Sequence, residues 1–202
     1  MGTTAIIGGS GLDTIDELKV TGRKVVRTPY GDPSGIVVTG SLFGQSYIFL
    51  PRHGANHTIP PHKVNYRANI WALKNCGVER IVAFAAVGGI DTGLDPGSIV
   101  IPDQLIDYTW GREHTFFDGE SEVVHHIDFT YPYSEELRHM LIKAAGKSNV
   151  PIVQDGTYAA TQGPRFETPA EIVKLERDGA TIVGMTGMPE AALASELGIE
   201  YA

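Results

Sequence analysis

The sequence contains a single cysteine, Cys76, so it cannot form an internal disulfide, and a reducing compartment is expected. It lacks any apolar run near the roughly 20 residues that a membrane-spanning helix needs, and it lacks the charged and then apolar start of a secretion signal. Basic residues are also scarce, with 16 Lys and Arg against 24 Asp and Glu, and the net charge of −8 disfavours binding to nucleic acid or to a membrane. These absences predict a soluble cytoplasmic protein.

Apolar residues make up 42% of the 202 residues, which is enough to bury one good core. The sequence shows no internal repeat, no low-complexity segment and no cluster of Gly and Pro that would mark a linker. We therefore expect a single domain over residues 1–202.

Residues 181–197 change from a short β-branched run to an alternation of Ala and Leu, which predicts a buried strand that turns sharply into a helix. Pro189 suits the first helical position, and Glu190 would complement the positive end of the helix dipole. Met185 and Thr186 would then lie at the carboxyl end of the strand, beside free backbone N–H groups, where α/β proteins bind ligands. An ordinary connection between a strand and a helix is the alternative.

A second strand end lies near the N-terminus, where the predicted strand at residues 3–7 runs into the glycine turn at residues 8–11. Small residues there would let backbone N–H groups approach an anion, and Ser10 would add a hydroxyl donor. The dinucleotide-binding fingerprint fails, because Thr14 occupies its third glycine position. The turn therefore predicts either a phosphate contact or a bare glycine turn.

Two further strands end in the same way. Residues 80–87 form an unbroken apolar run, typical of a central strand covered on both faces, and they end at Gly88. Residues 156–161 predict a strand that leads to Phe166 and Glu167, where Glu167 is either a solvent-facing carboxylate or a reader of the hydrogen-bonding edge of a flat ligand. We expect four strand ends to surround one crevice, at Ser10, Gly88, Phe166 and Thr186.

A predicted hairpin, with strands at residues 35–39 and 46–50, leads into Arg52, His53 and His57. An Arg beside a His at a strand end favours an anion clamp, because Arg offers planar bidentate donors and His adds another. A metal site at His53 and His57 is disfavoured, since their spacing requires a helix and the flanking Pro and Gly oppose one. Solvated surface histidines are the third interpretation.

Helices are expected at residues 65–77, at residues 137–145 and from the capping box at Thr168 to about Arg177. A strand is expected at residues 98–101. The long aromatic insertion that follows, over residues 103–133, is too irregular for a core element, so we expect it to form a pocket wall, a subunit contact, or both.

Four ordered motifs together resemble the trimeric purine nucleoside and methylthioadenosine phosphorylase family, and the match covers practically the whole chain. They are the segments 8–11, 52–54, 161–168 and 184–190. Residues 60–69, 111–116 and 184–197 resemble more closely the bacterial members that act on methylthioinosine. The resemblance implies an α/β fold with a mixed, twisted central sheet flanked by helices, and a homotrimer with its active sites at the subunit boundaries.

The resemblance also implies roles for individual residues. Met185 would pack under the ribose, Phe166 would lie against the base, and Glu167 would read the base. His126, in the insertion, would reach the 5′ group in a neighbouring subunit's pocket. Ala85 stands where the methylthioadenosine enzymes commonly have Thr, so this chain lacks the hydroxyl that the Thr side chain would contribute to phosphate binding. Phosphate would be held by Ser10, Arg52, His53 and Thr186 together with the backbone at Ala85 and Ala86.

The implied reaction is phosphate attack on C1′ of a purine nucleoside, with inorganic phosphate as co-substrate, no metal and no other cofactor. Glu167 stands where methylthioadenosine phosphorylases usually carry Ser, which favours methylthioinosine as substrate and hypoxanthine with 5-methylthioribose 1-phosphate as products. A methylthioadenosine phosphorylase and a general purine nucleoside phosphorylase are the alternatives. The family's base-reading Asp or Asn would lie beyond Ala202, so we expect the chain to stop before the last strand and the C-terminal helix.

Two other classes of protein share part of this pattern. A nucleotide-dependent oxidoreductase would have the same strand-to-glycine junctions, but the dinucleotide fingerprint and an acidic ribose reader are missing. A non-catalytic nucleoside-binding protein would keep Phe166 and Met185 but would not need the clamp formed by Arg52 and His53. A requirement for phosphate separates both from a phosphorylase.

Overall fold

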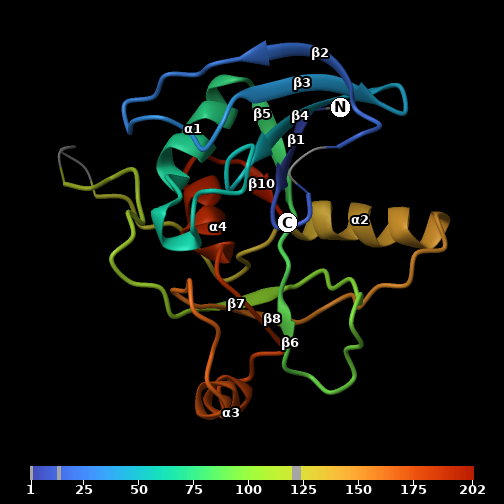
Figure 1. The fold of residues 1–202 in the computed structure, drawn as a ribbon, viewed down its shortest axis with the longest axis vertical. Helices are drawn as coiled ribbons and strands as arrows, with labels where there is room; N and C mark the ends of the chain where they lie inside the picture. Colours follow the sequence, from blue (N-terminus) through green and yellow to red (C-terminus); the bar gives the residue numbers. More distant parts are fainter. Residues whose placement is uncertain (1, 13–14, 120–123) are drawn as a thin grey trace.

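The computed structural model describes residues 2–12, 15–119 and 124–202. In these ranges the chain forms a mixed α/β fold, as predicted, with its strands divided between two sheets and its helices around them (Figure 1). The strands are β1 (Thr3–Gly8), β2 (Lys19–Lys24), β3 (Val37–Leu42), β4 (Gln45–Pro51), β5 (Val78–Ala83), β6 (Gly88–Gly89), β7 (Gln104–Asp107), β8 (Thr157–Ala160), β9 (Ile182–Gly184) and β10 (Glu200–Tyr201). The helices are α1 (Tyr66–Asn75), α2 (Glu135–Lys147), α3 (Pro169–Arg177) and α4 (Gly187–Glu196), with a short 3-10 helix η1 (Pro61–Lys63).

The larger sheet has the strand order β10-β5-β1-β4-β3-β2 and occupies the upper part of Figure 1. Strand β1 runs parallel to both β4 and β5, and β10 runs parallel to β5. The predicted hairpin is confirmed as the antiparallel pair β3 and β4. Its two turn residues, Phe43 and Gly44, both have positive φ angles, 49° and 81°, as a tight hairpin with right-handed strand twist requires. The parallel strands bring the ends of β1, β4 and β5 to one edge.

The smaller sheet has the strand order β6-β9-β8-β7 and lies below the first in Figure 1. Strands β7, β8 and β9 are parallel, and β6 pairs with β9 in the antiparallel direction. The predicted strands near residues 156–161 and 181–184 are confirmed as β8 and β9. The insertion was expected to be too irregular for a core element, but its first residues form β7, which pairs in parallel with β8.

Two predicted strands differ from the structure. The apolar run at residues 80–87 stays in the sheet only to Ala83, and Phe84 and Val87 are 48% and 38% exposed. Phe84 still donates its N–H to the carbonyl oxygen of Ile7 in β1, but its own carbonyl oxygen accepts a hydrogen bond from the side chain of Arg52. Residues 98–101 form only an isolated bridge, between Val100 and Val153.

The predicted helices are confirmed, and their ends follow the local signals. The side chain of Asn65 accepts a hydrogen bond from the backbone of Ala68 and caps α1, and Gly77 follows its end with a φ of 78°. Thr168 and Glu171 form the predicted capping box at the start of α3. Within α4, Met188 has an extended backbone, so the regular helix begins at Pro189, as expected.

The main core lies between the central strands of the larger sheet and the helices α1 and α4, which pack against each other. Fully buried aliphatic side chains from both layers fill it: Ile7, Leu50, Ile70, Leu73, Ile81 and Leu193. This core holds the end of β4 against the start of α4, where the site is built. No helix in the described ranges is long and apolar enough to cross a membrane.

Candidate active site

The four predicted strand ends meet at one cavity of about 820 Å³. Ser10 follows β1, Gly88 opens β6, Phe166 follows β8, and Thr186 follows β9. The cavity is within the size range of pockets that hold small organic ligands. The parallel strands of both sheets therefore direct their carboxyl ends to a common site, as the sequence predicted.

Every predicted site residue except His126 lines this cavity. His126 is exposed and lies in the insertion, outside the cavity wall of this chain. The lining also includes residues that the sequence did not single out, from the segment that follows β4. The predicted residues in the wall are Ser10, Arg52, His53, Ala85, Ala86, Phe166, Glu167, Met185 and Thr186.

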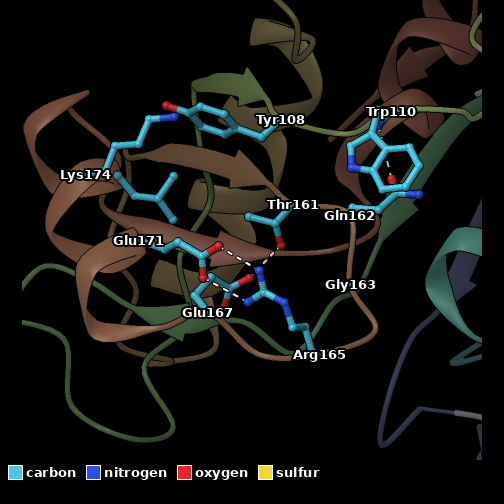
Figure 2. A pocket seen from close by; sticks show the side chains of 10 residues that line it. Tyr108, Trp110, Thr161, Gln162, Gly163, Arg165, Glu167, Glu171 and Lys174 are labelled. Carbon is cyan, nitrogen blue, oxygen red and sulfur yellow. Dashed lines mark hydrogen bonds and ion pairs between the residues drawn. The ribbon is translucent and has the colours of Figure 1, made fainter.

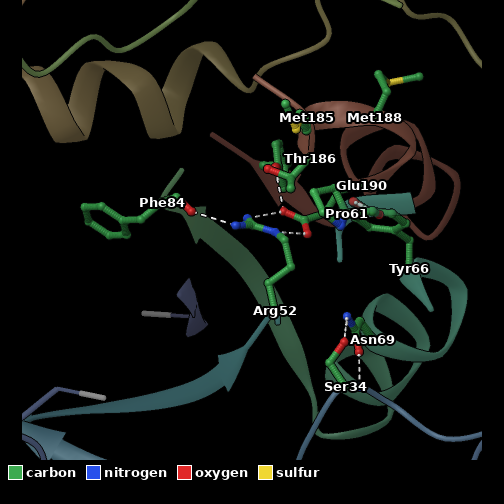
Figure 3. Close-up of polar contacts among 12 residues, drawn as sticks. Ser34, Arg52, Pro61, Tyr66, Asn69, Phe84, Met185, Thr186, Met188 and Glu190 are labelled. Carbon is green, nitrogen blue, oxygen red and sulfur yellow. Dashed lines mark hydrogen bonds and ion pairs between the residues drawn. The ribbon is translucent and has the colours of Figure 1, made fainter. Parts of the chain in front are cut away.

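Arg52, which lines the cavity, forms a buried bidentate ion pair with Glu190 (Figure 3). Its Nε and Nη2 atoms each donate to one carboxylate oxygen at 2.7 Å, and Nη1 donates to the carbonyl oxygen of Phe84 at 2.7 Å. Tyr201 donates its hydroxyl to the same carboxylate at 2.8 Å. Burial alone would lower the pKa of Arg52, but the charge and hydrogen bonds of Glu190 raise it overall, so the guanidinium stays charged.

This geometry corrects one expectation. Glu190 does not simply complement the helix dipole, because its carboxylate is fully buried and occupied by Arg52 and Tyr201. Arg52 itself is 1% exposed, so its side chain is part of the buried structure. Its Nη1 and Nη2 atoms each retain one further hydrogen, and these are the donors it can offer to a ligand.

Gly9 lets the first glycine turn approach the Arg52 side chain. A Cβ atom at this position would lie 2.4 Å from the carbonyl oxygen of Phe84 and 2.9 Å from Nη1 of Arg52. Both distances are too short for any side chain, so the close approach depends on glycine. The neighbouring Ser10 is thereby brought to the same side of the cavity as the guanidinium.

His53 is buried beside Arg52 and held in one ring orientation. Its Nδ1 atom lies 2.8 Å from the carbonyl oxygen of Ile59, and because a carbonyl only accepts, Nδ1 carries the hydrogen. Burial lowers the pKa of His53 below its usual value, and the charges of Arg52 and His57 lower it further, against the effect of the Ile59 hydrogen bond. The ring is therefore held neutral, with Nε2 as an acceptor.

Ser10 and Thr186 provide the hydroxyl groups of the cavity. The Oγ atom of Ser10 lies 3.3 Å from Nε2 of His57, whose ring is 4.6 Å from that of His53. The side chain of Thr186 does not cap α4. The expectation of free backbone N–H groups beside it is wrong, because the N–H groups of Thr186 and Gly187 lie 3.3 and 3.4 Å from the hydroxyl oxygen of Tyr158.

Phe166 and Glu167 form the opposite part of the lining. Phe166 is 85% exposed, so its ring is available to a flat partner. Thr161 donates its hydroxyl to Oε1 of Glu167 at 2.6 Å and thereby fixes the carboxylate (Figure 2). Met185 packs against Gly163, whose φ is 61° and where a Cβ atom would lie 2.4 Å from the Met185 sulfur. These contacts join the segment after β8 to the segment after β9.

A second hollow of about 360 Å³ lies on the other side of Glu167, beside Trp110 and Lys174 (Figure 2). Arg165 and Glu171 form an exposed bidentate pair in its wall, at 2.7 and 2.9 Å. Over the residues that the structure describes, no group of three or more His, Cys, Asp or Glu side chains is placed to hold a metal ion.

We expect Arg52→Met to lower the free energy of unfolding by about 3–5 kcal/mol, because the charge of Glu190 would remain buried without a cation to compensate it. The double variant Arg52→Met/Glu190→Gln should lose less, since no uncompensated charge remains while the amide can still accept from Tyr201. Urea denaturation of the wild type and both variants measures this difference. A double variant less stable than Arg52→Met would contradict the conclusion that the buried charge of Glu190 causes the loss of stability.

The lowered pKa of His53 predicts an acid-sensitive contribution to stability. The unfolded chain binds a proton at His53 more readily than the folded chain, so the contribution is full above about pH 6.5 and declines as the pH falls below it. In His53→Asn, whose amide can still donate to Ile59, the free energy of unfolding should fall less between pH 7 and pH 5 than in the wild type. If the free energy of unfolding of the wild type and of His53→Asn changed equally with pH, His53 would not be held neutral.

The sequence and structure were compared with known proteins. The model of the Phosphorylase superfamily matches residues 3–202. A protein of Pseudomonas syringae pv. tomato named "Probable S-methyl-5'-thioinosine phosphorylase" is 55% identical over 198 residues, which span 98% of this chain and 80% of that protein. The "6-oxopurine nucleoside phosphorylase" of Pyrococcus furiosus is 49% identical over 204 residues, spanning 98% of this chain and 76% of that protein.

The comparison with solved structures also identifies phosphorylases. The structure described as "Methylthioadenosine phosphorylase from Schistosoma mansoni in complex with tubercidin" matches with a TM-score of 0.96 and 37% identity, and it covers 100% of this chain and 78% of that chain. The likeness in fold extends over every strand end that lines the cavity, and the family predicted from the motifs is confirmed. The chain therefore belongs to the phosphorylase superfamily.

Proposed function

We propose that this protein catalyses the phosphorolysis of a 5′-methylthio purine nucleoside, with S-methyl-5′-thioinosine preferred. The products are hypoxanthine and 5-methylthioribose 1-phosphate. One observation carries the proposal: a single cavity combines the anion donors around Arg52 with an exposed Phe166 and a fixed Glu167 carboxylate. The relatives that are 52% to 55% identical and named for S-methyl-5′-thioinosine support the same substrate.

Phosphate would bind at the polar part of the cavity. The remaining hydrogens of Arg52 and the hydroxyls of Ser10 and Thr186 can donate to its oxygens, and the backbone at Ala85 and Ala86 lines the same wall. The neutral ring of His53 can accept a hydrogen bond from a phosphate oxygen that carries a proton. Since Arg52 is fixed by Glu190, little side-chain entropy is lost when the anion binds.

The nucleoside would lie between this anion and the segment after β8. Phe166 would contact the purine and Met185 would pack under the ribose. As hydrogen phosphate forms its bond to C1′, the bond from C1′ to N9 breaks and its electron pair leaves with the base. The base takes up a proton at N7, which is balanced by the proton that hydrogen phosphate gives up. The protein contributes by holding both partners in line and by stabilising the charges that develop, so the chain's residues form no covalent intermediate. The proposal requires no metal or other cofactor.

Glu167 supports a 6-oxopurine base. Thr161 donates to Oε1, which leaves Oε2 to accept from the ligand. Hypoxanthine presents an N1–H donor to such a carboxylate, whereas adenine presents a bare N1 acceptor. A mismatched buried polar pair costs about 1–3 kcal/mol, which corresponds to a tenfold to hundredfold preference. The oxo base is therefore favoured.

Two related activities and one non-enzymatic function are the alternatives. The structural likeness to a methylthioadenosine phosphorylase favours the amino base, and relatives named for 6-oxopurine nucleosides favour a general purine nucleoside phosphorylase. A nucleoside-binding protein without activity would not need the anion donors. We further propose a homotrimer in the cytoplasm, in which His126 completes a neighbouring pocket. Exposed aromatic side chains in the same insertion support a contact with another copy, since Trp110 and Tyr131 are 69% and 73% exposed.

We expect base release only when phosphate is present, with kcat/KM falling from methylthioinosine to inosine to methylthioadenosine. Glu167→Ser should reduce the preference for the oxo base by about tenfold, because the carboxylate acceptor is lost. A coupled spectrophotometric assay with both methylthio nucleosides measures this ratio.

Glu171→Ser is the matched control, since Glu171 is a nearby carboxylate that pairs with Arg165 and does not line the main cavity. Its substrate ratio should stay at the wild-type value. Activity without phosphate would refute phosphorolysis, whereas a wild type that prefers methylthioadenosine would refute only the assignment of the base.

The proposed trimer predicts a particle of three chains in sedimentation velocity. His126→Ala should raise the nucleoside KM by about tenfold through loss of one polar contact, without dissociating the trimer. His139→Ala, at a histidine that is exposed on α2, should leave the KM unchanged. A fully active monomer would exclude the shared site.

A further inference from the structure

Arg112 is a buried cation in the insertion after β7, and it is 8% exposed. Its Nη1 atom donates to the carbonyl oxygens of Met185 and Met188 at 2.9 and 2.6 Å and lies 3.3 Å from the hydroxyl of Tyr66. Its Nη2 atom lies 2.9 Å from the carbonyl oxygen of Gln162 and 3.3 Å from that of Thr161, and its Nε atom donates to the side-chain oxygen of Gln162 at 3.1 Å. One side chain therefore contacts three separate parts of the chain.

These parts include both segments that face the nucleoside in the proposed site. Thr161 and Gln162 precede Phe166 and Glu167 on the segment after β8. Met185 begins the segment between β9 and α4 and is followed directly by Thr186. Arg112 bridges the two segments at their backbone carbonyls, so the separation between the base side and the ribose side depends on its guanidinium.

The environment of Arg112 differs from that of Arg52. No carboxylate among the described residues forms an ion pair with Arg112, and its charge is compensated by carbonyl dipoles and by the ring of Tyr66 at 5.5 Å. A buried charge is costly unless its hydrogen bonds are satisfied. The planar guanidinium can donate in several fixed directions at once, which the ammonium of a lysine cannot do.

A purely structural role is the competing explanation, and the chain offers a matched case. Arg138 is also buried, at 6% exposed, and also donates to backbone carbonyls, those of Pro102 and Gln154. Its contacts do not include any residue that lines the cavity. A comparison of variants at Arg112 and Arg138 therefore distinguishes an effect on stability from an effect on the site.

We propose that Arg112 is a positioning residue for the nucleoside, which sets the geometry between the Phe166–Glu167 segment and Met185 without touching the substrate. The proposal rests on the proposed function. Phosphate should depend on Arg112 less, because only Thr186 among its proposed side-chain contacts lies on a segment that Arg112 contacts. Ser10, Arg52 and His53 lie on other elements. A displacement of about 1 Å in such a site can cost on the order of a hundredfold in rate.

The test is a comparison of Arg112→Lys with Arg138→Lys, using kcat and the KM values for methylthioinosine and phosphate alongside free energies of unfolding from urea denaturation. We expect Arg112→Lys to raise the nucleoside KM and lower kcat by about tenfold or more each, with a change in phosphate KM of less than about threefold. Arg138→Lys should lose stability without either kinetic change.

Gln162→Leu provides a second variant, should Arg112→Lys fail to fold. It removes the side-chain oxygen that accepts from Arg112 and from the backbone N–H of Trp110, and it keeps the backbone contacts of Arg112. We expect it to raise the nucleoside KM while phosphate KM is unchanged. The proposal is overturned if Arg112→Lys and Arg138→Lys have the same kinetics at the same loss of stability. It is also overturned if the KM values for methylthioinosine and for phosphate rise equally in Arg112→Lys. A wild type without phosphate-dependent base release refutes the proposed function itself, and that result is obtained before any variant is compared.

Discussion

The buried ion pair between Arg52 and Glu190 joins the end of β4 to the start of α4, and the site depends on this connection. Desolvating both charges is compensated by the bidentate geometry, by Tyr201 and by the carbonyl oxygen of Phe84. The last of these contacts connects Arg52 to the segment that follows β5, which lines the cavity. A single fixed guanidinium thus joins the end of β4 to the segment after β5 and to α4.

The cavity is organised by fixed polar groups and glycine turns, and each part is held by a contact outside the ligand space. His53 is oriented by Ile59, Glu167 by Thr161, and Met185 by the close approach of Gly163. Such preorganisation lowers the cost of binding, because the donors and acceptors do not need to be ordered when the ligand arrives. It suits a reaction in which the protein holds two partners in line.

In the proposed function, the specificity of the site would depend on a small difference in hydrogen bonding at the base. Glu167 lies between the main cavity and the second hollow, and its position is fixed by one short hydrogen bond. Relatives named for methylthioinosine and for 6-oxopurine nucleosides share this fold with a methylthioadenosine enzyme. The proposed contact at Glu167 would allow the same strand-end architecture to accept a different base if the residue at the edge of the purine changed.

The sequence alone determined the elements whose signals are local: the hairpin at Phe43 and Gly44, the caps at Asn65 and Thr168, and the glycine-rich strand ends that identified the family and the shared crevice. The role proposed for His126 stays a prediction. Only the tertiary structure decided that Arg52 is buried against Glu190, 138 residues away, that β5 ends at Ala83, and that Arg112 bridges two segments by their carbonyls. Capping, turn geometry and periodicity act within a few residues, so they can be read from the chain. The partner of a buried charge is set by which distant groups the fold brings together, and backbone carbonyls carry no mark in the sequence.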